Sequence, residues 1–392
     1  MVLEFLLKYK FIILFYLLII IFLILKRKRL EIQAKIIVLY RMKWGLRWMD
    51  KYATKFREWI ILLGYIGVGA GYIGLIFISY ILVKNLYDLI TTPSTVSGVS
   101  LVLPGVNVPG LGVLPFWYWI MAIFVIALVH EFSHGIVARA HNIPVKNTGI
   151  VFFGPIMGAF VEPDEKKLRK EKEITQYSVY AAGSFSNILL ALIAILLLNV
   201  LFLPWQQSMV TPEGFTFESY VNESYPFAQA GLAAGTRITG INNMPTPHFQ
   251  EFAKELSYYK PRDRIRVNTK DKEYSITLAE DPDNPRKSFL GIQEIRNEEE
   301  VKEAYSTGLR YWLYYLIDWL TGFLYWLYFL SLGIGLFNLL PLPIVDGGRM
   351  AQTFLHRLKG PEKGERRYRQ ISILFLVILL LSLFFPLLSK LF

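Results

Sequence analysis

The sequence of 392 residues contains no cysteine. A disulfide framework, thiolate chemistry and a cysteine-ligated metal site are therefore excluded, and cysteine usage says nothing about the redox compartment. Charged residues are also few, at 19%, whereas hydrophobic residues make up 54% and aromatic residues 15%. Such a chain is far more apolar than a soluble domain of this length, which predicts an integral membrane protein.

The formal net charge of +11 is compatible with a nucleic-acid partner as well as with a membrane. The basic residues, however, cluster just outside apolar runs, most densely over residues 26–57 and 349–369. This is where the positive-inside rule places them. We therefore interpret the charge as membrane topology and expect no nucleic-acid partner.

Apolar runs long enough to cross about 30 Å of hydrocarbon predict about six membrane spans. They lie near residues 5–25, 60–84, 116–138, 177–203, 321–341 and 371–391. The first run lacks a small-residue cleavage site and is followed by four basic residues, so we expect a retained anchor rather than a removed signal peptide.

The two basic clusters set the expected orientation in the cell membrane. Both should be cytoplasmic, which places both termini outside. This count requires that residues 310–320, rich in Trp and Tyr, are not a seventh crossing, and we expect them to lie in the outer interface.

Two segments break the helical pattern. Residues 149–163, GIVFFGPIMGAFVEP, are apolar but interrupted by glycine and proline, which favours a re-entrant β-hairpin packed inside the protein. Residues 205–300 are polar and should form an extracytoplasmic α+β domain, with strand-like RITGIN, helix-like FQEFAKEL and two strands in RIRVNTKDKEYSITL. The expected organisation is 1–59 (anchor and basic segment), 60–204 (first membrane part), 205–300 (soluble domain) and 301–392 (second membrane part).

The stretch HEFSH places His130, Glu131 and His134 near the end of an apolar span. Residues four apart share one face of a helix, so both imidazoles can bind one Zn²⁺, and the glutamate beside them can act as general base. Ionisable groups at membrane depth are costly, which favours a functional site over two satisfied polar side chains.

A hydrolytic zinc site needs a third protein ligand. The remaining histidines are His141, His248 and His356, and we interpret all three as loop or outer-domain residues. Asp346 in FNLLPLPIVDGGRM is the stronger candidate, since it follows a span that descends to the side on which the HEFSH helix ends. The prolines before it and the glycines after it should hold it on an extended segment facing inward.

These motifs together resemble the site-2 proteases, the intramembrane zinc metalloproteases. HEFSH matches one span of that family, NLLPLPIVDG matches the end of a later one, and AGSFSN supplies the family's G-x-x-x-N through Gly183 and Asn187. AQAGLAAGTRITGINN is similar to part of the PDZ domains inserted in many members, with Thr236 where Asp is common. The resemblance covers about 60–392 and leaves 1–59 unexplained.

The resemblance implies one Zn²⁺ per chain, held by His130, His134 and Asp346, with Glu131 as general base. It also implies that Asn338, Asn187 and Gly154 of the hairpin bind substrate or its oxyanion. For Asn187 and Asn338, hydrogen bonds that only hold the helices together remain an alternative. The implied activity is hydrolysis of peptide bonds within or near transmembrane helices, close to the cytoplasmic side.

The expected partners are transmembrane protein substrates and the bilayer, and the PDZ-like domain is expected to bind substrate termini. Three other functions stay open: a non-catalytic scaffold with a PDZ-like partner-binding domain, a zinc protease of the prenyl-protein type, and a transporter. The intact Glu131 argues against the first. The N-x7-DG segment argues against the second, which uses a glutamate as third ligand, and the lack of inverted repeats argues against the third. The oligomeric state and the substrate's identity are not predicted.

Overall fold

The computed structural model describes residues 9–33, 37–91, 98–99, 102–108, 111–154, 156–282 and 284–388. The chain divides into two compact units. Unit 1 comprises residues 1–198 and 322–392, and unit 2 comprises residues 199–321. Unit 2 encloses the predicted 205–300 domain.

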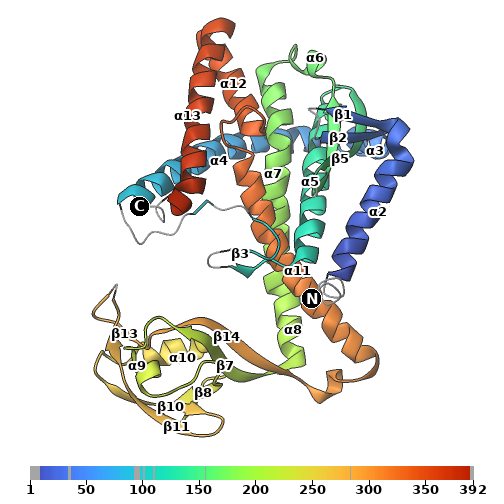
Figure 1. Cartoon of the computed structure of the whole chain (residues 1–392). Coiled ribbons are helices and arrows are strands. Elements are labelled where there is room, and N and C mark those ends of the chain that lie inside the picture. Colours follow the sequence, from blue (N-terminus) through green and yellow to red (C-terminus); the bar gives the residue numbers. More distant parts are fainter. Residues whose placement is uncertain are drawn as a thin grey trace. The chain divides into compact units, whose positions relative to one another are not determined.

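Unit 1 is mainly helical (Figure 1). Its helices are α2 (Lys10–Lys26), α3 (Leu46–Lys55), α4 (Arg57–Thr91), α5 (Phe116–Ala140), α6 (Glu165–Leu168), α7 (Glu173–Leu197), α12 (Asp346–Lys359) and α13 (Pro361–Leu388), with a 3₁₀ turn at Arg27–Arg29. Its strands are β1 (Leu30–Gln33), β2 (Ile37–Met42), β3 (Asn107–Val108), β4 (Gly112–Val113), β5 (Val145–Phe153) and β6 (Ile156–Pro163). Helix α11 (Gly308–Phe337) begins in unit 2 and continues into unit 1.

Five helices of the described chain are long and apolar enough to cross a membrane. They are α4, α5, the helical run Glu173–Met209, α11 and α13. The chain is therefore a multi-pass membrane protein by length and composition of its helices. The first predicted span, 5–25, begins outside the described residues, and the described chain there forms the 17-residue helix α2, which ends at Lys26. Residues 310–320 belong to the same helix as the predicted span 321–341, so they form no separate crossing among the described residues. Their place in the outer interface stays a prediction.

The predicted hairpin forms an antiparallel pair, β5 and β6, joined near Gly154. The described N-terminal segment extends this pair into a four-stranded sheet with the order β1-β2-β5-β6. Arg41 on β2 reaches across β5 to the Glu162 carboxylate, with donor–acceptor distances of 2.7 to 3.2 Å, and this bond holds the pKa of Glu162 below its usual value. Residues 30–42 are thus part of the sheet of unit 1, whereas the sequence predicted a separate segment over residues 1–59.

The core of unit 1 forms where α5 and α7 pack closely. Fully buried alanines on both helices, Ala138 and Ala181 among them, permit this approach. Helix α3 packs on the other side of α5 through Met49, which is fully buried against Gly135. The helix that carries the HEFSH stretch is therefore fixed from two sides.

Unit 2 contains a six-stranded antiparallel sheet with three short helices among its described residues. Its strands are β7 (Val210–Tyr220), β8 (Ile238–Ile241), β9 (Met244–Pro245), β10 (Arg264–Thr269), β11 (Glu273–Thr277) and β14 (Ile292–Val301), with a separate pair β12 (Ala279–Glu280) and β13 (Ser288–Phe289). Its helices are α8 (Leu203–Met209), α9 (Pro226–Gln229) and α10 (Phe249–Leu256), with a π-helical turn at Leu198–Phe202 leading into α8 and a 3₁₀ turn at Glu303–Tyr305.

The predicted elements of this domain are confirmed, namely a strand in RITGIN, a helix in FQEFAKEL and two strands in RIRVNTKDKEYSITL. Four phenylalanines fill its core because their positions alternate along β7 or face inward from α9 and α10. They are Phe215, Phe217, Phe227 and Phe252, all fully buried.

Candidate metal centre

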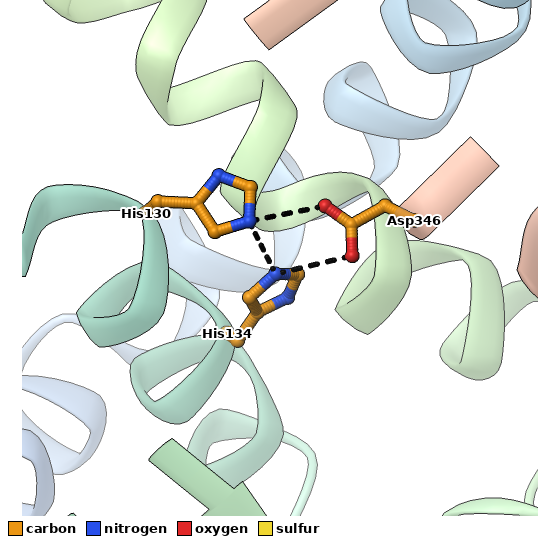
Figure 2. Close-up of side chains that lie close together, drawn as sticks. All are labelled: His130, His134 and Asp346. Carbon is orange, nitrogen blue, oxygen red and sulfur yellow. Dashed lines mark hydrogen bonds and ion pairs between the residues drawn. The ribbon is translucent and has the colours of Figure 1, made fainter. Parts of the chain in front are cut away.

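Two histidines and one aspartate converge between α5 and the start of α12 (Figure 2). His130 and His134 lie one turn apart on α5, and their Nε2 atoms are 3.2 Å from each other. Asp346 faces both rings, with Oδ2 at 3.2 Å from His130 Nε2 and Oδ1 at 3.4 Å from His134 Nε2. Among the described residues this is the one group of three such side chains that could hold a metal ion.

The spacing and chemistry of these three groups fit zinc. Tetrahedral ligands at a zinc–nitrogen distance of about 2.0–2.1 Å lie about 3.3 Å apart, which agrees with the three separations above. Two imidazoles and one carboxylate are a ligand set found in hydrolytic sites, which keep one position open. The sequence prediction of the metal ligands thus corresponds to residues that the structure brings together.

Gly183 on α7 leaves open space beside both ring nitrogens. A Cβ atom at this position would lie 2.4 Å from His134 Nε2 and 2.5 Å from His130 Nε2. Both distances are far below normal contact, so any larger residue would fill the space in front of the two nitrogens. The first residue of the G-x-x-x-N pattern therefore has a steric reason to be glycine.

Hydrogen bonds at the far side of each ring select the tautomer that ligation requires. His134 Nδ1 lies 2.7 Å from the Val179 carbonyl, which only accepts, so Nδ1 carries the proton and Nε2 keeps its lone pair. The Asn187 amide lies 3.1 Å from His130 Nδ1 through Nδ2, while its buried Oδ1 has no partner among the described residues. Rotating this amide by half a turn lets Oδ1 accept from Nδ1–H and frees Nε2 of His130 for a metal.

Asp346 is the first residue of α12, not part of an extended segment as the sequence suggested. Ser184 Oγ donates to its Oδ2 at 3.2 Å. Its two carboxyl oxygens face the Nε2 atoms of His130 and His134, so the carboxyl group is oriented to share a metal ion with both rings.

The two glycines after Asp346 allow the chain to turn tightly there. A Cβ at Gly347 would lie 2.0 Å from the Leu339 carbonyl oxygen, and one at Gly348 would lie 1.7 Å from that of Leu342. The Gly347 N–H also donates to the Asn338 carbonyl at 2.8 Å. Backbone thus packs directly on backbone, which fixes the start of α12 against the end of α11.

Glu131 lies beside the ligands in a cavity of about 430 Å³. Its Oε2 accepts a hydrogen bond of 3.0 Å from the Val161 N–H of β6. The cavity is also lined by His130, His134 and Asp346, so a carboxylate, the three candidate ligands and space for a substrate segment adjoin each other. This arrangement can activate water for attack on a carbonyl.

The other predicted site residues are placed as follows. Asn187 and Asn338 both line the cavity, and Asn187 also accepts through its backbone carbonyl from Ser331 of α11 at 2.8 Å. Gly154 is an exposed residue of the β5–β6 turn with φ of +54°, and it is not among the described residues that line the cavity. Its substrate-binding role stays a prediction.

The three remaining histidines make other contacts. His141 lies 3.3 Å from Ser178 Oγ, and His356 lies 3.1 Å from Glu365. His248 lies beside Glu251 in unit 2. None belongs to the metal-binding group, but His356 lies in helix α12 and not in a loop as the sequence suggested.

Comparison with known families identifies the chain. The family described as peptidase family M50 matches residues 118–383, a range that contains His130, His134 and Asp346. The chain belongs to peptidase family M50. M50 peptidases are zinc metalloproteases of the site-2 protease type, and the ligand set found here agrees with that membership.

Two further similarities concern parts of the chain. An uncharacterized protein of Methanocaldococcus jannaschii, MJ0971, is 27% identical over 265 residues, which cover 66% of this chain and 62% of that protein. The PDZ domain of the SdrC-like protein Lmo2051 from Listeria monocytogenes is 26% identical, and the match covers 21% of this chain and 86% of that domain with a TM-score of 0.19. This score is too low to identify a fold, so the PDZ assignment stays a prediction.

Two contacts of this M50 site were missed in the sequence. Ser184 lies directly after Gly183 in the quoted AGSFSN stretch, yet its bond to Asp346 depends on which face of α7 meets α12. The hydrogen bond from the Val161 N–H to Glu131 depends on β6 lying beside α5. For the Ser184 contact, the only signal in the sequence was a small polar residue next to Gly183. For the Val161 contact there was no signal.

Proposed function

We propose that this M50 protein is an intramembrane zinc endopeptidase that hydrolyses peptide bonds within or near transmembrane helices of membrane proteins. The observation that carries the proposal is the convergence of His130, His134 and Asp346 on one point, with Glu131 in the same cavity. A structural metal site would need no such carboxylate. Bound zinc would supply a Lewis acid that lowers the pKa of water and polarises a carbonyl.

Glu131 acts as the general base in this proposal. It takes the proton of the attacking water and later passes it to the leaving amine. The Val161 N–H holds one carboxylate oxygen, which fixes the direction of the other. Asn338, at the wall of the same cavity, is suited to donate its amide to the substrate carbonyl.

Strand β6 offers a place for an unwound substrate. It is the last strand of the β1-β2-β5-β6 order, and Val161 N–H points away from β5 toward Glu131. Backbone groups alternate along a strand, so those of Met157 and Ala159 point to the same side as Val161. A substrate segment freed from its helix has unpaired amides, and pairing with this edge would satisfy them.

In the proposed orientation the metal centre lies near the cytoplasmic boundary, and residues 205–300 are extracytoplasmic. The dense basic stretches 26–57 and 349–369 support this placement. Water can then reach the site from the cytoplasmic headgroup region, while a transmembrane substrate enters from the bilayer.

Metal analysis combined with a cleavage assay tests the proposed function. The purified full chain should contain about one zinc per chain and should cut a transmembrane reporter. Chelation should remove both the metal and the cleavage, and added Zn²⁺ should restore them. Purified protein without zinc, or cleavage that survives complete removal of the metal, would contradict the proposal.

The soluble domain is proposed to filter substrates, either by binding an exposed end or by excluding bulky outer domains. Val210 pairs with Val301, so a short linker can replace residues 210–301. This deletion should change which membrane proteins are cut, while zinc content and hydrolysis of a short reporter persist. Identical substrate profiles of the deleted and full chains would count against a filtering role.

A further inference from the structure

Helix α3 presents two exposed stripes of different chemistry. Every fourth residue from position 48 is a large aromatic one, between 39% and 59% exposed, and we call this set the aromatic stripe: Trp48, Tyr52 and the C-cap residue Phe56. A second set of exposed residues at the same spacing is basic, and we call it the basic stripe: Arg47, Lys51 and Lys55. The spacing of four places each set along one side of the helix.

The remaining face of α3 is fixed to the membrane unit. Met49 and Ala53 are buried, and the Met49 Sδ atom would lie 2.7 Å from a Cβ at Gly135. Trp44 also packs edge-to-face on Phe132, with ring centroids 5.9 Å apart. The two stripes therefore point away from α5 in a defined direction and cannot turn inward.

The basic stripe lacks compensating charge inside the protein. None of its three cations forms an ion pair within the part of the chain that the structure describes. The one acidic residue on α3, Asp50, instead pairs with Arg139 of α5 at 3.2 Å. Lys55 Nζ lies 5.1 Å from the centroid of the Phe56 ring. Three cations beside three exposed aromatic rings are thus left for an external anionic ligand.

The position of α3 along the chain indicates the nature of that ligand. The helix ends at Lys55, and α4, a candidate membrane span of 35 residues, begins at Arg57. Trp59 in the first turn of α4 is 68% exposed. Tryptophan and tyrosine concentrate at the headgroup level of membranes, so α3 lies where the chain enters the bilayer.

We propose that α3 is an anionic-phospholipid binding element, in which the basic stripe contacts lipid phosphates and the aromatic stripe lies among the headgroups. An amphipathic helix with cations on one side and large aromatic rings beside them is suited to this position. A soluble acidic partner would gain little from Trp48 and Tyr52, which favour a part-apolar environment. Through Met49 and Gly135, the element also connects the lipid surface to the helix that carries His134.

Quenching of Trp48 fluorescence by brominated lipids tests this element in the full chain. The Trp48 contribution is the difference between wild type and Trp48→Phe in phosphatidylcholine vesicles doped with phosphatidylglycerol or phosphatidylcholine brominated near the headgroup. Brominated phosphatidylglycerol should associate with Trp48 about fivefold more strongly than brominated phosphatidylcholine. Raising the ionic strength should reduce this preference in the wild type.

A triple variant and a matched control locate the effect. Arg47→Gln/Lys51→Gln/Lys55→Gln should abolish the preference. Lys254→Gln/Lys260→Gln/Lys270→Gln, which removes the same charge from exposed positions of unit 2, should retain it. Equal quenching by the two lipids in the wild type, no quenching by either, or an unchanged preference in the α3 triple variant overturns the proposal.

Discussion

Replacement of Glu131 by glutamine is expected to lower the rate of peptide hydrolysis by about 10³-fold while the zinc content remains at the wild-type level. Glutamine keeps the shape of the side chain and its bond from the Val161 N–H, but it cannot take a proton from water. Glu131 is not one of the three residues that converge on the metal position. Loss of cleavage without loss of metal would therefore distinguish the role of Glu131 as a base from the role of the three metal ligands.

The measurement is cleavage of a transmembrane reporter in parallel with metal analysis of the same preparation. Glu171→Gln provides a control, because Glu171 is exposed in the same unit and does not line the cavity. This control should cleave like the wild type. A Glu131→Gln protein that cleaves at the wild-type rate would rule out the proposed general base.

Gly183→Ala is expected to weaken zinc binding by about 100-fold or more and to abolish hydrolysis with it. The new methyl group would lie within 2.4 to 2.5 Å of both histidine Nε2 atoms. Either the imidazoles turn away or α7 moves from α5, and both responses separate the nitrogens from a common ion. A single methyl group thus acts as a steric block rather than as a change of polarity.

Zinc content of the full chain, followed by titration with a competing chelator, measures this effect. Gly69→Ala is the matched control, since a Cβ at Gly69 meets nothing within 4 Å and the residue lies in helix α4. It should bind zinc like the wild type. Normal zinc affinity in Gly183→Ala would show that the metal does not occupy the space beside the two nitrogens.

The ligands were predictable from the sequence because their chemistry is encoded locally. His130 and His134 lie one helical turn apart, so the backbone alone brings their rings together. Asp346 was predictable because prolines before it and glycines after it end one helix on a definite side of the membrane. In unit 2, the helix in FQEFAKEL was predictable for the same reason, a strong local pattern.

The remaining features depend on contacts between distant segments. The sequence gives no local sign that β2 will pair with β5, more than a hundred residues later. The role of Gly183 depends on which face of α7 packs on α5. The hydrogen bond between Glu131 and Val161 depends on the position of β6 beside α5. Such pairings follow from burial across the whole fold and not from the spacing of a motif.

The four-stranded sheet extends beyond the residues that match the peptidase family. The family match begins at residue 118, yet two of the four strands in the sheet come from residues 30–42. Arg41 in this outlying segment is bonded to Glu162, the residue next to the one that holds Glu131. A recombinant fragment limited to residues 118–383 would keep His130, His134 and Asp346. It would lose Arg41 and the bond that holds Glu162 beside Val161, the residue that binds Glu131.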